Sequence, residues 1–286
     1  MGMVYLNGDY VPLEEARISV LDRGFLFGDG VYEVIPVYGG KSFRLAEHLE
    51  RLDNSLTAIH LENPLSHEQW GEVLTRVIGD VAGNQSLYVQ VTRGVDSMRN
   101  HLFPSATVQP TVFAMAWEAK PRKPEIARDG ISAITLDDVR WLRCDIKSVA
   151  LLGNVLLRQA AEDAGTEESI LIRNGQVTEG SSTNVFLVLN GEILTPPKTN
   201  LLLPGITRDL VLDLAREAGM PCAERALTRA TLEDADEIWL TSSSREVVAV
   251  TRLDDDLVGD GKPGTTWQRM DELFQDYKAR LSESHA

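Results

Sequence analysis

A lysine at a change in chain pattern is the first residue that could do chemistry. Lys147 follows a mixed extended stretch and precedes 148–164, whose apolar period and opening serine predict a helix. Arg140 and Arg143 stand close in sequence and would disfavour its charged form, which makes the amine a better nucleophile for a carbonyl. Lys147 is therefore a Schiff-base candidate, although a solvated lysine at a helix start fits the same pattern.

A second stretch combines one carboxylate with three hydroxyl residues. Glu179 is followed by Gly180, by two serines and a threonine, and then by a strand-like run over 185–189. Glutamates are mostly exposed, so a turn-exposed side chain after a short strand also fits.

Four stretches, taken together and in this order, resemble a known family. They are DRG at 22–24, GDGVYE at 28–33, RWLRCDIKS at 140–148 and TEGSSTN at 178–184. The chain resembles the class IV aminotransferases, the fold type IV pyridoxal phosphate enzymes, from about residue 5 to about residue 250, and its nearest match is the D-amino acid (D-alanine) transaminases. The resemblance implies a two-domain mixed α+β or α/β fold. It also implies transamination between D-alanine-like amino acids and 2-oxo acids such as 2-oxoglutarate or pyruvate.

The resemblance gives two of these residues roles at the cofactor. Lys147 would hold pyridoxal 5'-phosphate and move a proton on the substrate. Glu179 would face the pyridine nitrogen, where an anion keeps the ring protonated and able to accept electrons.

The phosphate of the cofactor would be held by groups from three parts of the chain. Arg51 matches the phosphate arginine of the family's HLERL-like stretch. A helix opening at Ile206 and Thr207 would offer backbone N–H groups to the anion. Ser242 and Ser243, just beyond a predicted strand, would contribute further.

The substrate carboxylate needs a fixed orientation, and a planar guanidinium suits it. Arg99 and His101, spaced as Arg-x-His, resemble the carboxylate trap of D-amino acid transaminases, with Tyr32 as its third member. Alone, an Arg-x-His in a loop would be solvated. The rivals are a branched-chain L-transaminase, an (R)-amine transaminase, aminodeoxychorismate lyase and a non-enzymatic binding protein of the same fold. The last is disfavoured because the lysine, glutamate and phosphate motifs are all intact.

The composition excludes several other classes of protein. With 28 basic and 43 acidic residues the chain has a formal charge of −15, which argues against binding to nucleic acid or anionic membranes. Cys144 and Cys222 lack a CxxC or Cys/His partner, so neither a disulfide framework nor a metal site is expected, and a reducing cytoplasm fits. A signal sequence and a membrane-spanning apolar run are not expected either.

The elements that must position these residues follow from hydrophobic periodicity and turn residues. We expect helices at 45–59, 67–81, 208–218 and 266–280, strands at 31–38, 86–92, 111–117, 131–136 and 237–241, and hairpins about the Asn-Gly pairs at 7–8, 174–175 and 190–191. His48 and Arg51 lie off the apolar stripe of helix 45–59, and each, taken alone, would be solvated.

The stretch 119–124, with two prolines and several cations, is the best candidate for a linker. It would separate a smaller N-terminal domain, 1–118, from a larger C-terminal domain, 125–286, that carries Lys147. The resemblance further implies a homodimer in which Arg99 and His101 serve the neighbouring subunit's site.

Overall fold

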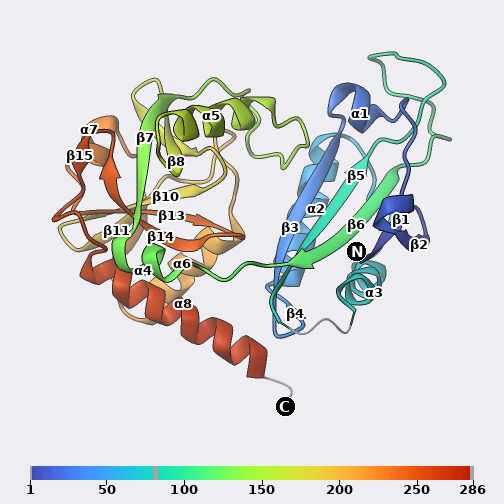
Figure 1. The fold of residues 1–286 in the computed structure, drawn as a ribbon. Coiled ribbons are helices and arrows are strands. Elements are labelled where there is room, and N and C mark those ends of the chain that lie inside the picture. Colours follow the sequence, from blue (N-terminus) through green and yellow to red (C-terminus); the bar gives the residue numbers. More distant parts are fainter. Residues whose placement is uncertain (1, 80–82, 284–286) are drawn as a thin grey trace. The chain divides into compact units, whose positions relative to one another are not determined.

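The computed structural model describes residues 2–79 and 83–283, which form two compact units (Figure 1). Unit 1 comprises Met1–Lys120, Ile146–Leu151 and Leu281–Ala286, and unit 2 comprises Pro121–Asp145 and Leu152–Arg280. The segment Ile146–Leu151 carries Lys147. It groups with unit 1, whereas the sequence pattern had placed it in the C-terminal domain.

Unit 1 is an antiparallel six-stranded sheet with two helices packed against it (Figure 1). The strand order is β2-β1-β6-β5-β3-β4, with bounds β1 Met3–Leu6, β2 Asp9–Pro12, β3 Gly30–Tyr38, β4 Lys41–Ser42, β5 Gln85–Thr92 and β6 Thr111–Glu118. The hairpin predicted at 7–8 is confirmed, since Asn7 and Gly8 both have positive φ.

The two larger helices of unit 1 bury their apolar stripes against one face of that sheet. Helix α2, Leu45–Ala58, presents Leu49, Leu52 and Leu56, which join a core with Val31 and Ile35 of β3. Helix α3, His67–Ile78, begins at a capping box. Both helices were predicted; the predicted end of the second, residue 81, lies outside the described residues.

The segment around Lys147 is extended rather than helical. The predicted helix 148–164 begins only at Leu152, as α5, Leu152–Asp163. The N–H of Tyr32 donates to the Lys147 carbonyl (2.9 Å) and the N–H of Val149 to the Gly30 carbonyl (3.1 Å). These bonds pair the segment with β3, which takes residues 148 and 149 out of the predicted helix.

Unit 2 is built on a nine-stranded mixed sheet. Its order is β12-β11-β10-β13-β14-β7-β8-β9, and β15 pairs with β14. The strands are β7 Ile131–Asp137, β8 Glu168–Arg173, β9 Gln176–Gly180, β10 Asn184–Leu189, β11 Glu192–Thr195, β12 Cys222–Glu224, β13 Glu237–Ser242, β14 Glu246–Leu253 and β15 Asp256–Leu257. The two hairpins predicted after β8 and β10 are confirmed, and three parallel pairs accompany them: β7 with β8, β7 with β14, and β11 with β12.

The remaining helices of unit 2 are α4 Pro124–Asp129, α6 Ile206–Glu217, α7 Arg229–Glu233 and α8 Thr265–Glu283. The predictions missed the short helix α1, Arg23–Phe27, of unit 1, the long strand β14, and the short elements β4, β12, β15, α4 and α7. Cys144 and Cys222 are both free thiols. Over residues 2–79 and 83–283, no helix has the length and apolar character needed to cross a bilayer.

Candidate active site

The backbone of Lys147 is fixed from two directions within unit 1. Its carbonyl accepts from Tyr32 of β3, and its N–H donates to the Ser55 hydroxyl of α2 over 3.2 Å. The Nζ atom lies 4.3 Å from the centroid of the Tyr32 ring, a favourable position for a cation over an aromatic face. A lysine held in this way can offer its amine from a defined position.

Arg51 and His48 share one carboxylate beneath the sheet. Glu33 accepts from Arg51 Nε and Nη2, each over 2.7 Å, and lies 2.8 Å from His48 Nδ1. Glu33 and His48 are fully buried and Arg51 is 6% exposed, so the expectation that the two helix residues are solvated was wrong. The physical reason is that Glu33 points from β3 toward α2, where a buried anion requires cationic or hydrogen-bonding partners.

These contacts set the charge states of the cluster. Burial would raise the pKa of Glu33, but the Arg51 guanidinium and His48 hold it well below its usual range. Burial lowers the pKa of His48. A neutral ring that donates from Nδ1 to Glu33 has an acceptor at Nε2, and that atom is buried without a partner among the described residues.

Arg99 and His101 lie in the loop between β5 and β6, and both side chains pack on Phe27. The Arg99 guanidinium carbon is 4.8 Å from the Phe27 ring centroid, and the His101 ring centroid is 5.2 Å from it. Tyr32 has other neighbours, Lys147 and Tyr88, the latter with ring centroids 5.7 Å apart.

Glu179, in unit 2, is a buried carboxylate with three donors. Its Oε1 accepts from Arg140 Nη1 (2.5 Å), and its Oε2 accepts from the Leu203 N–H (3.0 Å) and Asn184 Nδ2 (3.3 Å). It is 5% exposed, so the turn-exposed alternative was wrong. Burial raises the pKa of Glu179 to about 7, although Arg140 opposes the rise.

Arg140 divides its charge between two carboxylates. It pairs with Asp138 through Nε over 2.9 Å as well as with Glu179. Asp138 has a second cation, Arg173, at 2.9 Å, and its pKa is lowered to about 2 because these pairs outweigh its burial. The charge of Arg140 is therefore shared and neutralises Glu179 only in part.

The N-terminus of α6 has no side-chain cap, and its first residues are Ile206 and Thr207. The preceding Gly205 touches Asn184 so closely that an added Cβ would lie 2.0 Å from the amide oxygen. Uncapped N–H groups at a helix start can bind an anion. Ser242 ends β13, where its hydroxyl accepts from the Arg245 N–H (3.1 Å), and Ser243 follows in the turn.

These residues fit pyridoxal phosphate on two counts. A carboxylate has about four acceptor positions, and the donors Arg140, Leu203 and Asn184 occupy three at Glu179, which leaves one for a ring N–H. The uncapped start of α6 can take a phosphate. Among the described residues, no cluster of metal-binding side chains is present.

Glu33 and His48 received no role from the sequence, and Arg140 was expected to act on Lys147 but pairs with Asp138 and Glu179. Each lies within a stretch that was already singled out, because Glu33 follows Tyr32, His48 precedes Arg51 by three residues, and Arg140 opens the stretch of Lys147. The available signal was strand alternation, which places Glu33 on the same side as Val31.

Comparison with known proteins identifies the family. The amino-transferase class IV family matches residues 30–253, and the chain belongs to this family. It is 40% identical to the D-alanine aminotransferase of Staphylococcus haemolyticus over 278 residues, 97% of this chain and 98% of the relative. It is 40% identical to that of Listeria monocytogenes over 272 residues, 95% of this chain and 94% of the relative.

Solved structures agree with this assignment of fold. The branched-chain amino acid aminotransferase of Escherichia coli superposes with a TM-score of 0.92 at 27% identity, over 99% of this chain and 97% of that one. The branched-chain aminotransferase of Thermoproteus uzoniensis gives 0.88 at 26% identity, over 99% and 97%. The predicted fold class, a two-domain fold type IV aminotransferase, is confirmed.

Proposed function

We propose that this protein is a pyridoxal-phosphate-dependent D-amino acid transaminase, with D-alanine-like donors and 2-oxo acids such as 2-oxoglutarate or pyruvate as acceptors. The observation that carries the chemistry is Glu179, a buried carboxylate whose pKa is raised to about 7 and which keeps one acceptor position open. The D preference is supported by the full-length relatives named D-alanine aminotransferase.

When bound, pyridoxal phosphate supplies an aldehyde for the amino group and a ring that withdraws electrons from the substrate Cα. Glu179 would hold the ring N–H, and Arg140 lowers the pKa of that carboxyl, which favours its anionic form. The phosphate would be held by Arg51, Ser242, Ser243 and the N–H groups of Ile206 and Thr207. Glu33 orients Arg51 through its two hydrogen bonds.

Lys147 is the amine that holds the cofactor and the base that moves a proton at the substrate Cα. Its backbone pairing with β3 and the Tyr32 ring beside Nζ orient it. Tyr32, Arg99 and His101 bind the substrate carboxylate, which fixes the hydrogen presented to Lys147.

We propose a homodimer in which Arg99 and His101 serve the neighbouring subunit's site. A location in a reducing cytoplasm, away from nucleic acid and membranes, also stays a prediction, based on charge and cysteine usage.

Substrate class is tested by single half-reactions. The purified protein, which should be yellow, is incubated separately with D-alanine, L-leucine, (R)-1-phenylethylamine and aminodeoxychorismate, and the cofactor absorbance band and pyruvate are followed. We expect D-alanine to bleach the band fastest. Faster bleaching by L-leucine or by the amine, or pyruvate from aminodeoxychorismate, would replace the proposed activity with that rival.

The dimer proposal is tested by mixing two inactive variants, Arg99→Ala and Lys147→Ala. Random exchange makes about half the dimers mixed, each with one complete site of two, so roughly a quarter of wild-type activity should return. No recovery, despite exchange shown by mass spectrometry, would mean that Arg99 acts within its own chain.

A further inference from the structure

The loop that carries Arg99 and His101 is exposed, but buried groups hold it. Side chains near its tip are open to solvent, with Leu102 73% and Phe103 59% exposed. Long loops without regular structure in a compact unit are often functional. Such a loop can bind a carboxylate in one orientation only if something fixes its backbone.

A buried arginine fixes the backbone between the two side chains. Arg23, the first residue of α1, is 3% exposed, and its Nη1 donates to the carbonyl of Asn100 over 2.6 Å. Asn100 separates Arg99 from His101 in the sequence, so this bond acts at the centre of the Arg-x-His unit. Arg23 Nε donates to Asp29 over 2.8 Å, which aims the guanidinium.

A second arginine supports the same arrangement from the other side. Arg93 forms bonds of 2.9–3.1 Å to Asp29 through Nε and Nη2 and donates to the Ile59 carbonyl over 2.7 Å. Its guanidinium carbon lies 4.0 Å from the centroid of the Phe103 ring, farther along the loop. Asp29 is thus held by two arginines, and each of them also contacts the loop.

The ring on which Arg99 and His101 rest belongs to the same short helix as Arg23. Phe27 is the last residue of α1, and the guanidinium carbon of Arg23 also lies 4.9 Å from its ring centroid. One helix of unit 1 therefore contacts the backbone of the Arg-x-His unit and both of its side chains.

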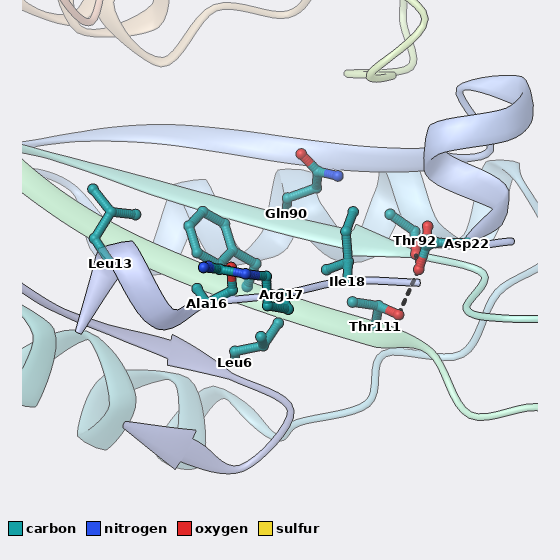
Figure 2. A pocket seen from close by; sticks show the side chains of 10 residues that line it. Leu6, Leu13, Ala16, Arg17, Ile18, Asp22, Gln90, Thr92 and Thr111 are labelled. Atoms are coloured by element: carbon teal, nitrogen blue, oxygen red, sulfur yellow. Dashed lines mark hydrogen bonds between the residues drawn. The ribbon is translucent and has the colours of Figure 1, made fainter. Parts of the chain in front are cut away.

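Helix α1 is itself anchored by a buried carboxylate, as Figure 2 shows beside a pocket of unit 1 of about 310 Å³. Asp22 is fully buried and caps α1 by accepting from the Gly24 N–H (2.8 Å). It also accepts from the hydroxyls of Thr92 (3.0 Å) and Thr111 (2.6 Å), at the end of β5 and the start of β6. The strands that flank the loop thus hold the helix that supports it.

We propose that Arg23 is a positioning residue for the substrate carboxylate: through the Asn100 carbonyl and the Phe27 ring it sets Arg99 and His101 before substrate binds. The inference rests on the proposed function, in which those two side chains bind that carboxylate. The planar fork matters because two separate nitrogens, Nε and Nη1, reach Asp29 and Asn100 in a fixed geometry that a lysine ammonium does not reproduce.

The test compares Arg23→Lys with Arg23→Met. The matched control is Arg76→Met, because Arg76 lies on α3 and packs over Tyr10, 3.7 Å from its ring centroid. Steady-state kinetics give KM and kcat with D-alanine and 2-oxoglutarate. Calorimetry on the holoenzyme gives the Kd of propionate, which has the carboxylate of alanine but no amine. We expect Arg23→Lys to raise both the KM and the Kd roughly tenfold, the equivalent of one lost charge-assisted hydrogen bond, with kcat changed less than about threefold.

A double variant separates positioning from general damage. If Arg23 acts through the loop, adding Arg23→Lys to Arg99→Ala should raise the Kd of propionate little further. Two results would overturn the inference. One is a double variant in which the effects of the two substitutions on the Kd of propionate multiply, and the other is an Arg23→Lys variant that loses kcat with KM and Kd unchanged. If Arg23→Met lowers the melting temperature too far for assay, Arg23→Lys, which keeps the charge beside Asp29, decides. If Arg99→Ala itself leaves the Kd of propionate unchanged, the carboxylate assignment fails together with the inference. If only Arg23→Lys leaves KM and Kd unchanged, the inference fails and the proposed function stands.

Discussion

Each unit buries one glutamate from a stretch that the sequence singled out, and the surroundings shift the pKa values of the two carboxyls in opposite directions. Glu33 in unit 1 receives the fork of Arg51 and a bond from His48, and its pKa lies well below the usual range. Glu179 in unit 2 receives one nitrogen of Arg140, which it shares with Asp138, and burial raises its pKa to about 7.

The difference shows that the number of donated charges, rather than burial, separates a structural carboxylate from one that can take part in chemistry. Glu33 has an arginine to itself and stays ionised, which suits a residue that orients Arg51. At Glu179 the charge of Arg140 does not offset the effect of burial. Near neutral pH the protonated and ionised forms of this carboxyl are therefore about equally populated. That property suits a partner for a ring nitrogen.

The largest effect, on the free energy of unfolding, should come from breaking the buried pair of Glu33 and Arg51. Glu33→Gln leaves the Arg51 guanidinium buried without its anion, which should lower the free energy of unfolding by about 3–5 kcal/mol. Denaturant unfolding measures it, with Glu72→Gln, an exposed glutamate on α3, as a control expected to stay within about 0.5 kcal/mol of wild type. If Glu33→Gln were as stable as Glu72→Gln, the contrast between Glu33 and Glu179 would be lost.

The second prediction is that the two glutamates give the apoprotein opposite pH dependences. The pKa of Glu179 rises from 4.5 to about 7 on folding, so its contribution to stability is fully present below pH 4.5 and is lost as the pH rises to 7, by about 3 kcal/mol in all. The pKa of Glu33 falls on folding, so its contribution is present above pH 4.5 and is lost as the pH decreases below that value.

Unfolding curves of the apoprotein between pH 2.5 and pH 8 compare wild type with Glu179→Gln and Glu33→Gln. Relative to Glu179→Gln, wild type should lose stability as the pH rises. Relative to Glu33→Gln, wild type should lose stability as the pH falls. Curves that run parallel at all pH values would mean that neither carboxylate has a shifted pKa.

The third prediction concerns chemistry alone. Glu179→Gln should bind the cofactor but slow the half-reaction with D-alanine roughly 100-fold, because a neutral amide stabilises ring protonation far less than a carboxylate. Stopped-flow absorbance measures this rate. An unchanged rate would show that the raised pKa of Glu179 has no catalytic use.

The smallest effect on cofactor chemistry is expected for Arg51→Ala, which should also destabilise the fold because it leaves Glu33 buried without its cation. It removes a charge-assisted phosphate contact worth roughly 1.5–3 kcal/mol and should weaken cofactor retention. Equilibrium dialysis of the holoenzyme measures the loss. Unaltered retention would leave Arg51 as a partner of Glu33 only.

The sequence predicted what depends on local pattern. Periodic leucines located α2, and the Asn-Gly pairs located the hairpins, because both signals act over a few residues. The extended segment at Lys147 was missed, since the bonds that remove it from the helix come from Tyr32 and Gly30, more than 100 positions away.

For the candidate site, too, the sequence indicated individual residues but not the contacts between distant parts of the chain. Lys147, Glu179 and Arg51 were selected by resemblance, but their partners were not. The pairing of Arg51 with Glu33 joins a helix to a strand, and the sharing of Arg140 between Glu179 and Asp138 depends on where β9 lies in the sheet. Such charge arrangements are properties of the fold.

The central claim, that Lys147 holds the cofactor, has a direct test. Borohydride reduction of the holoenzyme attaches the cofactor covalently to the amine that carries it, and peptide mapping by mass spectrometry locates the label. We predict a single label on Lys147 and none in Lys147→Ala, which should also lose the cofactor absorbance band and nearly all turnover. A label on any other lysine would contradict the account.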